Sequence, residues 1–126
     1  MSSYKTNQSP DQIHIGVTLI SPAPAKTFVE LDGHEILQSP DFSGGNLLPT
    51  ALASNADCQD KTIKVTTLID LSPLTEAQKT QAMEMIRINY SLDGGPDGLK
   101  QYRLHKTKWV RVFDDLFLNK FIDCIS

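Results

Sequence analysis

The sequence lacks the features that would direct a chain into a membrane or out of the cell. No run of apolar residues approaches the roughly 18 that a helix needs to cross a bilayer. The first 12 residues are polar and contain no apolar stretch like that of a secretory signal. We therefore expect a cytoplasmic protein without a membrane partner, in which residues 1–12 form a flexible N-terminal tail.

Cysteine is scarce, and the excess of charge of one sign is small. Cys58 and Cys124 are the two cysteines, and they show no CxxC or other metal-type spacing. We expect two free thiols, as is usual in the cytosol, while a Cys58–Cys124 disulfide is the alternative for an exported protein. The net charge of −3 is too small to create a strong field around the whole molecule.

Local motifs for metal binding and catalysis are absent as well. The three histidines are far apart and form none of the HxH, HxxxH or HExxH patterns that bind zinc. Cys58 is the better candidate for a Cys–His nucleophile pair, but Asp57 and Asp60 beside it disfavour a thiolate. We therefore predict no metal, no cofactor and no catalytic residue, and we favour a protein that is not an enzyme.

The chain does contain enough apolar sequence for one domain. It has 126 residues, of which 40% are hydrophobic, and a chain of this size buries roughly two-thirds of its unfolded surface. Apolar and polar residues alternate over 12–20 and over 62–71, which is the pattern of half-buried strands. We expect a single α+β domain over residues 13–126.

A β-hairpin is predicted over residues 27–37. Asp32 and Gly33 suit a two-residue type I′ turn, which needs positive φ at both central residues. The register of this turn sets Glu30 opposite Glu35, and two like charges in that position cost up to about 1 kcal/mol unless a cation lies near them. Either the register slips, or that face is solvated, or it meets a basic partner.

Two helices are predicted beside these strands. Residues 75–92 show an amphipathic pattern, with a capping box at Thr75 and Gln78 and the stop signal DGGPDG directly after it. Residues 114–125 gather their apolar side chains on one side of a second helix. We expect a largely antiparallel sheet, packed on one face by a central helix at about 75–92 and a C-terminal helix at about 114–125.

The remaining segments are a loop and a strand-rich stretch. Proline, glycine and polar residues are frequent over 38–61, which predicts a long irregular loop with one helical turn over 47–54. Residues 99–113 are rich in strand-forming residues. They predict either a hairpin that turns near Lys106 and Thr107 or one long bent strand.

The strongest functional indication is a basic segment in that stretch. Five of the 12 Lys and Arg residues fall within 12 positions, with aromatic residues between them, and no acidic residue occurs over 98–113. Such a segment suits an anionic partner, either an acidic protein surface or nucleic acid. The alternative is an exposed edge strand whose cations prevent aggregation. The candidate binding residues are Lys100, Arg103, His105, Lys106, Lys108, Trp109 and Arg111.

Three functions remain after these exclusions. We favour a non-enzymatic protein-interaction module, such as an accessory, inhibitor or immunity-type protein, that binds through the basic segment or the long loop. Its partner is another protein or a second copy of the chain, since the acidic hairpin over 30–35 complements the basic segment. The alternative is a small-molecule-binding domain or a motif-less enzyme, with a pocket between sheet and helix near Tyr90 and Trp109. A nucleic-acid binder is the third, and the acidic net charge counts against it.

Overall fold

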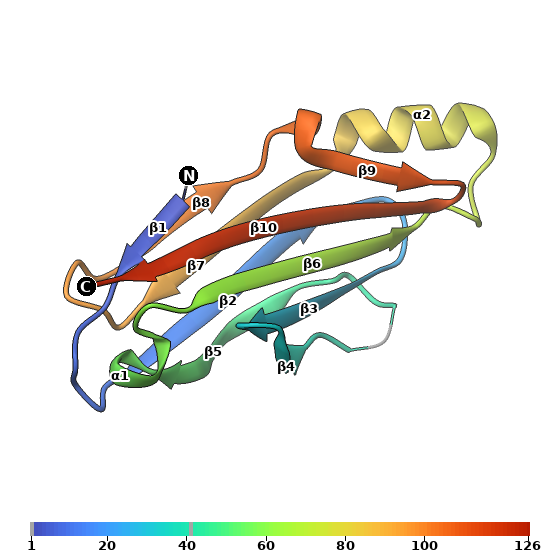
Figure 1. The fold of residues 1–126 in the computed structure, drawn as a ribbon. Helices are drawn as coiled ribbons and strands as arrows, with labels where there is room; N and C mark the ends of the chain where they lie inside the picture. The colour runs from blue at the N-terminus through green and yellow to red at the C-terminus, as the bar shows by residue number, and fades with distance from the viewer. Residues whose placement is uncertain (1, 41) are drawn as a thin grey trace.

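The protein folds as a sandwich of two β-sheets that lie face to face (Figure 1). The computed structural model describes residues 2–40 and 42–126. Within these residues, the larger sheet contains, in spatial order, β1 (Ser2–Lys5), β10 (Asp115–Ile125), β6 (Thr62–Asp70), β3 (Ala25–Leu31) and β4 (His34–Gln38), and β9 (Trp109–Val112) also pairs with β10. The smaller sheet contains β5 (Leu47–Ser54), β2 (Gln12–Ile20), β7 (Arg87–Asp93) and β8 (Lys100–Arg103).

One hydrophobic core fills the space between the sheets. The alternation predicted over 12–20 and 62–71 is confirmed, because β2 and β6 are strands that bury every second side chain. Ile15 on β2 and Val65 on β6 have no exposed surface. Burying one such side chain contributes about 1.5–3 kcal/mol, so this shared layer is the main force that holds the two sheets together.

The predicted hairpin is formed by β3 and β4, and its turn has the predicted geometry. The φ angle is +50° at Asp32 and +84° at Gly33, so both are positive, as a type I′ turn needs. Glu30 lies opposite Glu35, as that register requires. Lys64 on β6 is the neighbour of Glu30 on its other side. Lys64 is therefore the nearby cation that reduces the repulsion between the two glutamates.

The predicted α+β fold is wrong, first because the C-terminal segment is a strand. Residues 115–125 form β10, which pairs antiparallel with β6. Leu118 and Ile122 are fully buried in the core, whereas Phe117 and Phe121 lie on the opposite face of the strand. Apolar residues on both faces obscured the strand period, and the same residues also fit a helical period.

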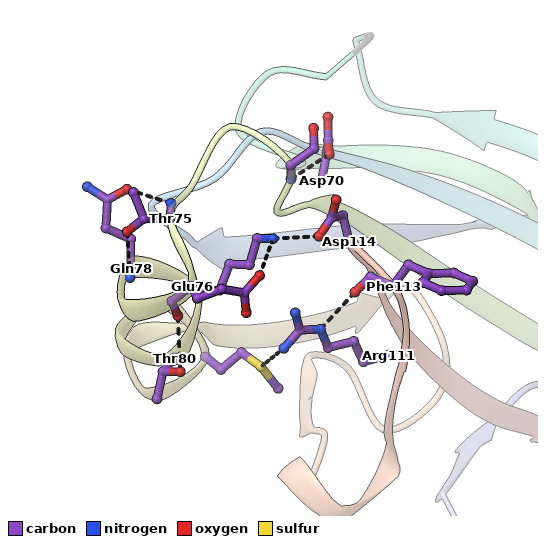
Figure 2. A network of polar contacts seen from close by, with 11 residues as sticks. Asp70, Thr75, Glu76, Gln78, Thr80, Arg111, Phe113 and Asp114 are labelled. Atoms are coloured by element: carbon purple, nitrogen blue, oxygen red, sulfur yellow. Dashed lines mark hydrogen bonds and ion pairs between the residues drawn. The ribbon is translucent and has the colours of Figure 1, made fainter.

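The predicted central helix exists, but it is shorter and lies at one end of the sandwich (Figure 1). It is α2 (Glu76–Met85), and its predicted capping box of Thr75 and Gln78 is confirmed (Figure 2). Lys79 ties the helix to the larger sheet, since its Nζ lies 2.6 Å from a carboxylate oxygen of Asp114, next to β10. In the described part of the chain, no helix is both long enough and apolar enough to span a bilayer.

The second half of the predicted central helix is a strand. After α2 the chain continues as β7, in which Ile88, Tyr90 and Leu92 point into the core in strand alternation. Ile86 and Tyr90 are also one helical turn apart in the sequence, so both periods fit this segment. Packing in the core favours the strand over the helix, because a strand here buries three side chains between the two sheets at once.

The long irregular loop predicted over 38–61 is mostly regular structure. Leu47–Ser54 forms β5 in place of the predicted helical turn, and α1 (Asn55–Cys58) follows it. Pro49 is compatible with this strand because β5 is an edge strand that pairs only with β2. Asp41, within the predicted loop, lies outside the described residues.

The N-terminal segment, expected as a flexible tail, contributes a strand to the larger sheet. β1 pairs in parallel with the last residues of β10. Tyr4 on β1 is fully buried. Its hydroxyl donates to the carbonyl oxygen of Gly98 at 2.7 Å and accepts from the N–H of Gly95 at 2.8 Å. This side chain anchors the N-terminal strand to the turn between β7 and β8.

The basic segment crosses from one sheet to the other. β8 pairs with β7 in the smaller sheet, a turn of 3₁₀-helix (η1, Lys106–Lys108) follows, and β9 pairs with β10 in the larger sheet. The chain thus turns near Lys106, as predicted, but the strands on either side of the turn do not pair with each other. Side chains of this crossing segment therefore border the space between the sheets.

Candidate functional site

A cleft opens between the two sheets where the edge of the larger sheet is interrupted. On the side away from β6, β9 pairs with residues 115–118 of β10 and β1 pairs with residues 122–125, so the two strands lie beside opposite ends of β10 (Figure 1). Among the described residues, 119–121 therefore have no ladder partner on that side. Residues of this gap and of β8 line a cleft of about 1040 Å³.

Lys120 reaches into the cleft from the inner face of β10. It lies opposite Val65 on β6, which is fully buried, and directly paired residues project to the same face of a sheet. Its Nζ donates to the carbonyl oxygen of Arg103 at 2.9 Å and lies 6.0 Å from the centre of the Tyr102 ring. Burial lowers the pKa of Lys120, and no ion pair joins it to a carboxylate of the described residues.

Arg103, His105 and Lys108 of the basic segment line the same cleft. Neither Arg103 nor Lys108 forms an ion pair with any described residue. The described lining of the cleft includes no Asp or Glu side chain. The potential inside the cleft is therefore positive, and walls of low dielectric strengthen it.

The rest of the wall is largely apolar. It includes Tyr102 on β8, Val110 on β9 and Phe121 on β10, and the last two are 51% and 53% exposed. The hydroxyl of Tyr102 donates to the carbonyl oxygen of Ser3 at 2.7 Å, which links β8 to β1 at one end of the cleft. Burial, with nearby Tyr4, raises the pKa of Tyr102 to about 12, so this hydroxyl is neutral at physiological pH.

Two of the predicted binding residues are held by acidic neighbours outside the cleft. Lys100 lies 3.6 Å from a carboxylate oxygen of Asp97. Lys106 lies 3.1 Å from one of Glu84 on α2, and its Nζ is 5.8 Å from the centre of the Trp109 ring. These lysines have partners within the chain, so they contribute less to the binding of an external anion than Arg103 does.

Arg111 and Trp109 lie on the other side of the crossing segment. The Nε of Arg111 donates to the carbonyl oxygen of Phe113 at 2.8 Å (Figure 2). Both residues line a separate hollow of about 320 Å³ beside α2. The structure therefore brings three of the seven predicted binding residues to one cleft and separates the other four from it.

The pocket expected between sheet and helix is present as two hollows, the one beside α2 and another of about 670 Å³ lined by Glu84 of α2, Ile86 and Arg103. Trp109 borders both, but Tyr90 is fully buried in the core and borders none of the described hollows. Burial raises the pKa of Tyr90 well above its usual value, so this hydroxyl does not titrate in the physiological range. The larger cleft lies between the two sheets instead, where sequence alone placed no opening.

Lys120 is the site residue that sequence reasoning missed. The predicted C-terminal helix turned it outward, away from the core. The signal that identifies it is its position between Leu118 and Ile122, in a series of apolar residues spaced by two. A lysine in the middle of such a series is a charge on the buried face of a strand.

The two cysteines are buried, free thiols outside the cleft. Cys58 on α1 and Cys124 on β10 lie side by side. The Cys124 thiol donates a hydrogen bond to the sulfur of Cys58, and this bond, together with burial, raises the pKa of the Cys124 thiol well above its usual value. Neither thiol is both exposed and ionised, as a nucleophile needs to be.

Comparisons with known proteins find no relative: no family model, curated protein or solved structure matches this chain. In the described residues, no group of three or more His, Cys, Asp or Glu side chains is placed to hold a metal ion. The distinctive chemistry on this molecule is the cationic cleft between β8 and β10.

Proposed function

We propose that the protein is a non-enzymatic interaction module that binds an acidic segment of a partner protein in the cleft between β8 and β10. The observation that carries the proposal is the charge of the cleft. Arg103, Lys108 and Lys120 line it, and no carboxylate of the described residues does. A partner that brings carboxylates would neutralise these cations. We place this module in the cytoplasm, where Cys58 and Cys124 remain thiols.

Protection of an exposed sheet edge explains these cations only in part. β8 and β9 are edge strands, and lysine or arginine on an edge strand discourages pairing with other chains. Lys120 faces the space between the sheets beside the unpaired residues 119–121, and an inward-pointing charge also discourages edge pairing. Edge protection does not require Arg103, Lys108 and Lys120 to line one cleft without a described carboxylate, whereas binding of an anion in the cleft accounts for that arrangement.

A protein partner fits the cleft better than nucleic acid does. Tyr102, Val110 and Phe121 form apolar parts of its wall, which match the carbon stems of acidic side chains. A nucleic-acid backbone needs a row of exposed cations, whereas Lys100 and Lys106 are already paired with acidic residues.

Binding of a labelled peptide of mixed glutamate and leucine, followed by fluorescence anisotropy, tests the proposal. We expect Arg103→Glu combined with Lys108→Glu to weaken binding by about tenfold or more, because each surface pair contributes about 0.2–1 kcal/mol and each reversal also adds repulsion. The matched control is Lys5→Glu with Lys61→Glu. It changes the net charge equally at residues outside the cleft and should retain most of the affinity.

Two results would overturn the proposal. If the two double variants lost equal affinity for the peptide, the total charge of the protein and not the cleft would determine binding. Tighter binding of a labelled single-stranded DNA, with an affinity that falls steeply as salt is added, would indicate nucleic acid as the partner. The circular dichroism spectrum of each variant shows whether the fold is retained.

A further inference from the structure

We infer that the cleft contains a subsite for one carboxylate, which a glutamate or aspartate side chain of the partner places on the Nζ of Lys120. This inference rests on the proposed function and specifies what the cleft recognises. The subsite lies between the sheets, whereas Arg103 and Lys108 belong to the adjoining basic segment. Lys120 is the contact at which the partner is recognised, and the other two cations contribute attraction around it.

The first argument is the unused hydrogen-bonding capacity of Lys120. An ammonium group has three N–H donors, and one contact, with the carbonyl oxygen of Arg103, is formed at 2.9 Å. A carbonyl dipole does not neutralise a full charge, and no described carboxylate forms an ion pair with Lys120. The Lys120 ammonium therefore has donors available for an anionic acceptor that enters the cleft.

The second argument is access. An anion reaches Lys120 because the larger sheet is open at residues 119–121, between β1 and β9. At least one of these three residues directs its backbone N–H and C=O toward the open side, since successive residues of a strand alternate between its two edges. An extended segment of the partner meets both main-chain groups and the Lys120 ammonium at this opening.

The third argument is the shape of the wall, which selects a carboxylate on a carbon stem. Tyr102 stands beside Lys120 in the lining, with its ring centre 6.0 Å from the ammonium, and Val110 and Phe121 border the opening from the outer face of the larger sheet. A glutamate side chain buries its methylene groups against such surfaces while its carboxylate reaches the ammonium. A phosphate carries its charge on all sides and gains nothing from an apolar wall, so inorganic phosphate should bind more weakly than a carboxylate of this kind.

Titrations followed by NMR of isotope-labelled lysine side chains test the subsite directly. The probe is glutarate, which has the carboxylate and stem of a glutamate side chain, and the neutral control is glutaramide. We expect glutarate to shift the Lys120 resonance in a saturable manner and glutaramide to leave it unchanged. The lysine that serves as internal control is Lys5, which lies on β1 and does not line the cleft. Its resonance should stay constant.

Variants connect the subsite to partner binding. We expect Lys120→Met to bind the labelled acidic peptide about tenfold more weakly. The matched control is Lys26→Met, because Lys26 also lies over an aromatic ring, that of Phe28 at 5.2 Å, and is outside the cleft. It should bind the peptide and glutarate as the wild-type protein does.

The outcomes separate this inference from the proposed function. If the peptide binds through Arg103 and Lys108 but glutarate leaves Lys120 unaffected, the subsite is wrong and the proposed function stands. If phosphate shifts Lys120 as strongly as glutarate, the cleft accepts any anion and the assignment to a carboxylate fails. If neither the peptide nor glutarate binds, both the subsite and the proposed function are refuted.

Discussion

Replacing Lys120 by methionine is expected to make the fold more stable. Lys120 lies between Leu118 and Ile122 on the inner face of β10 and opposite Val65, three residues with no exposed surface. Methionine is flexible and nearly as long as the lysine stem, so it fills the same space without a charge. We expect the free energy of unfolding to rise by about 0.5–2 kcal/mol, as for other substitutions that relieve a conflict in a core.

Two contacts of Lys120 oppose this gain in stability. The hydrogen bond from Lys120 to the Arg103 carbonyl oxygen contributes about 1 kcal/mol. The contact with the Tyr102 ring contributes about 0.5–1 kcal/mol. Desolvation acts in the other direction, since burial lowers the pKa of Lys120 and so disfavours the charged amine. We expect desolvation, together with the packing that methionine adds, to outweigh the two contacts.

The increase in the free energy of unfolding caused by Lys120→Met should also depend on pH. The pKa of Lys120 in the folded protein is lowered, whereas that of a lysine in an unfolded chain is about 10.4. Between these two values the unfolded chain binds more protons than the folded one, so the stability of the wild-type protein rises with pH. The difference in stability between Lys120→Met and wild type is therefore complete at neutral pH and narrows as the pH approaches about 10.4.

Unfolding in guanidinium chloride, followed by the fluorescence of Trp109, measures these differences. Lys5→Met is the matched control, because Lys5 is exposed on β1 at the edge of the larger sheet, where a substitution should change stability by no more than about 0.5 kcal/mol. If Lys120→Met lowered the free energy of unfolding by more than about 1 kcal/mol, the contacts of the ammonium would outweigh its desolvation. The explanation by desolvation of the Lys120 charge would also be refuted if the difference in stability between Lys120→Met and wild type did not narrow at alkaline pH.

Three further predictions concern the interior of the protein. Thr27→Val should cost about 2–3 kcal/mol and Thr67→Val about 1 kcal/mol in chemical unfolding, because Thr27 donates to a backbone carbonyl at 2.6 Å and meets the hydroxyl of Thr67 at 2.8 Å; equal costs would contradict this order. Gly94→Ala should lower the melting temperature markedly, since φ is +104° there and a Cβ would overlap the backbone oxygen of the first residue of β2. Cys58 and Cys124 are buried, so they should react with a thiol reagent much more slowly in the native protein than in urea, and fast native labelling would contradict their burial.

Local patterns were sufficient where only one face of a strand is apolar. β2 and β6 alternate over their whole length, so the strand period has no competitor in their sequences. The turn at Asp32 and Gly33 could be predicted because few residues adopt positive φ at two successive positions. The capping box of α2 was equally local, since it depends on two residues three positions apart.

Prediction failed where tertiary contacts decide between two periods. β7 and β10 carry apolar residues at both helical and strand spacing, and only burial between the sheets selects the strand. The pairing of β1 with β10 joins the two ends of the described chain, and no local pattern indicates such a partner. The cleft depends on that pairing, because β1 and β9 leave the gap at 119–121 between them. For this reason the cationic residues of the basic segment could be predicted from the sequence, while the cleft that three of them share could not.

Lys120 connects the failed prediction of β10 with the proposed site. A hydrophobic residue at this position would have completed the series of apolar residues spaced by two from Leu116 to Cys124, which would have strengthened the strand period. The same residue would have improved the core, since it would replace a desolvated charge with packing against Leu118 and Ile122. The local sequence pattern and the stability of the core thus both disfavour lysine at position 120. A residue that is unfavourable by several such criteria is expected at a functional site. The binding of a carboxylate supplies a reason for this lysine, and for its place beside Arg103 and Lys108 in one cleft, that folding does not provide.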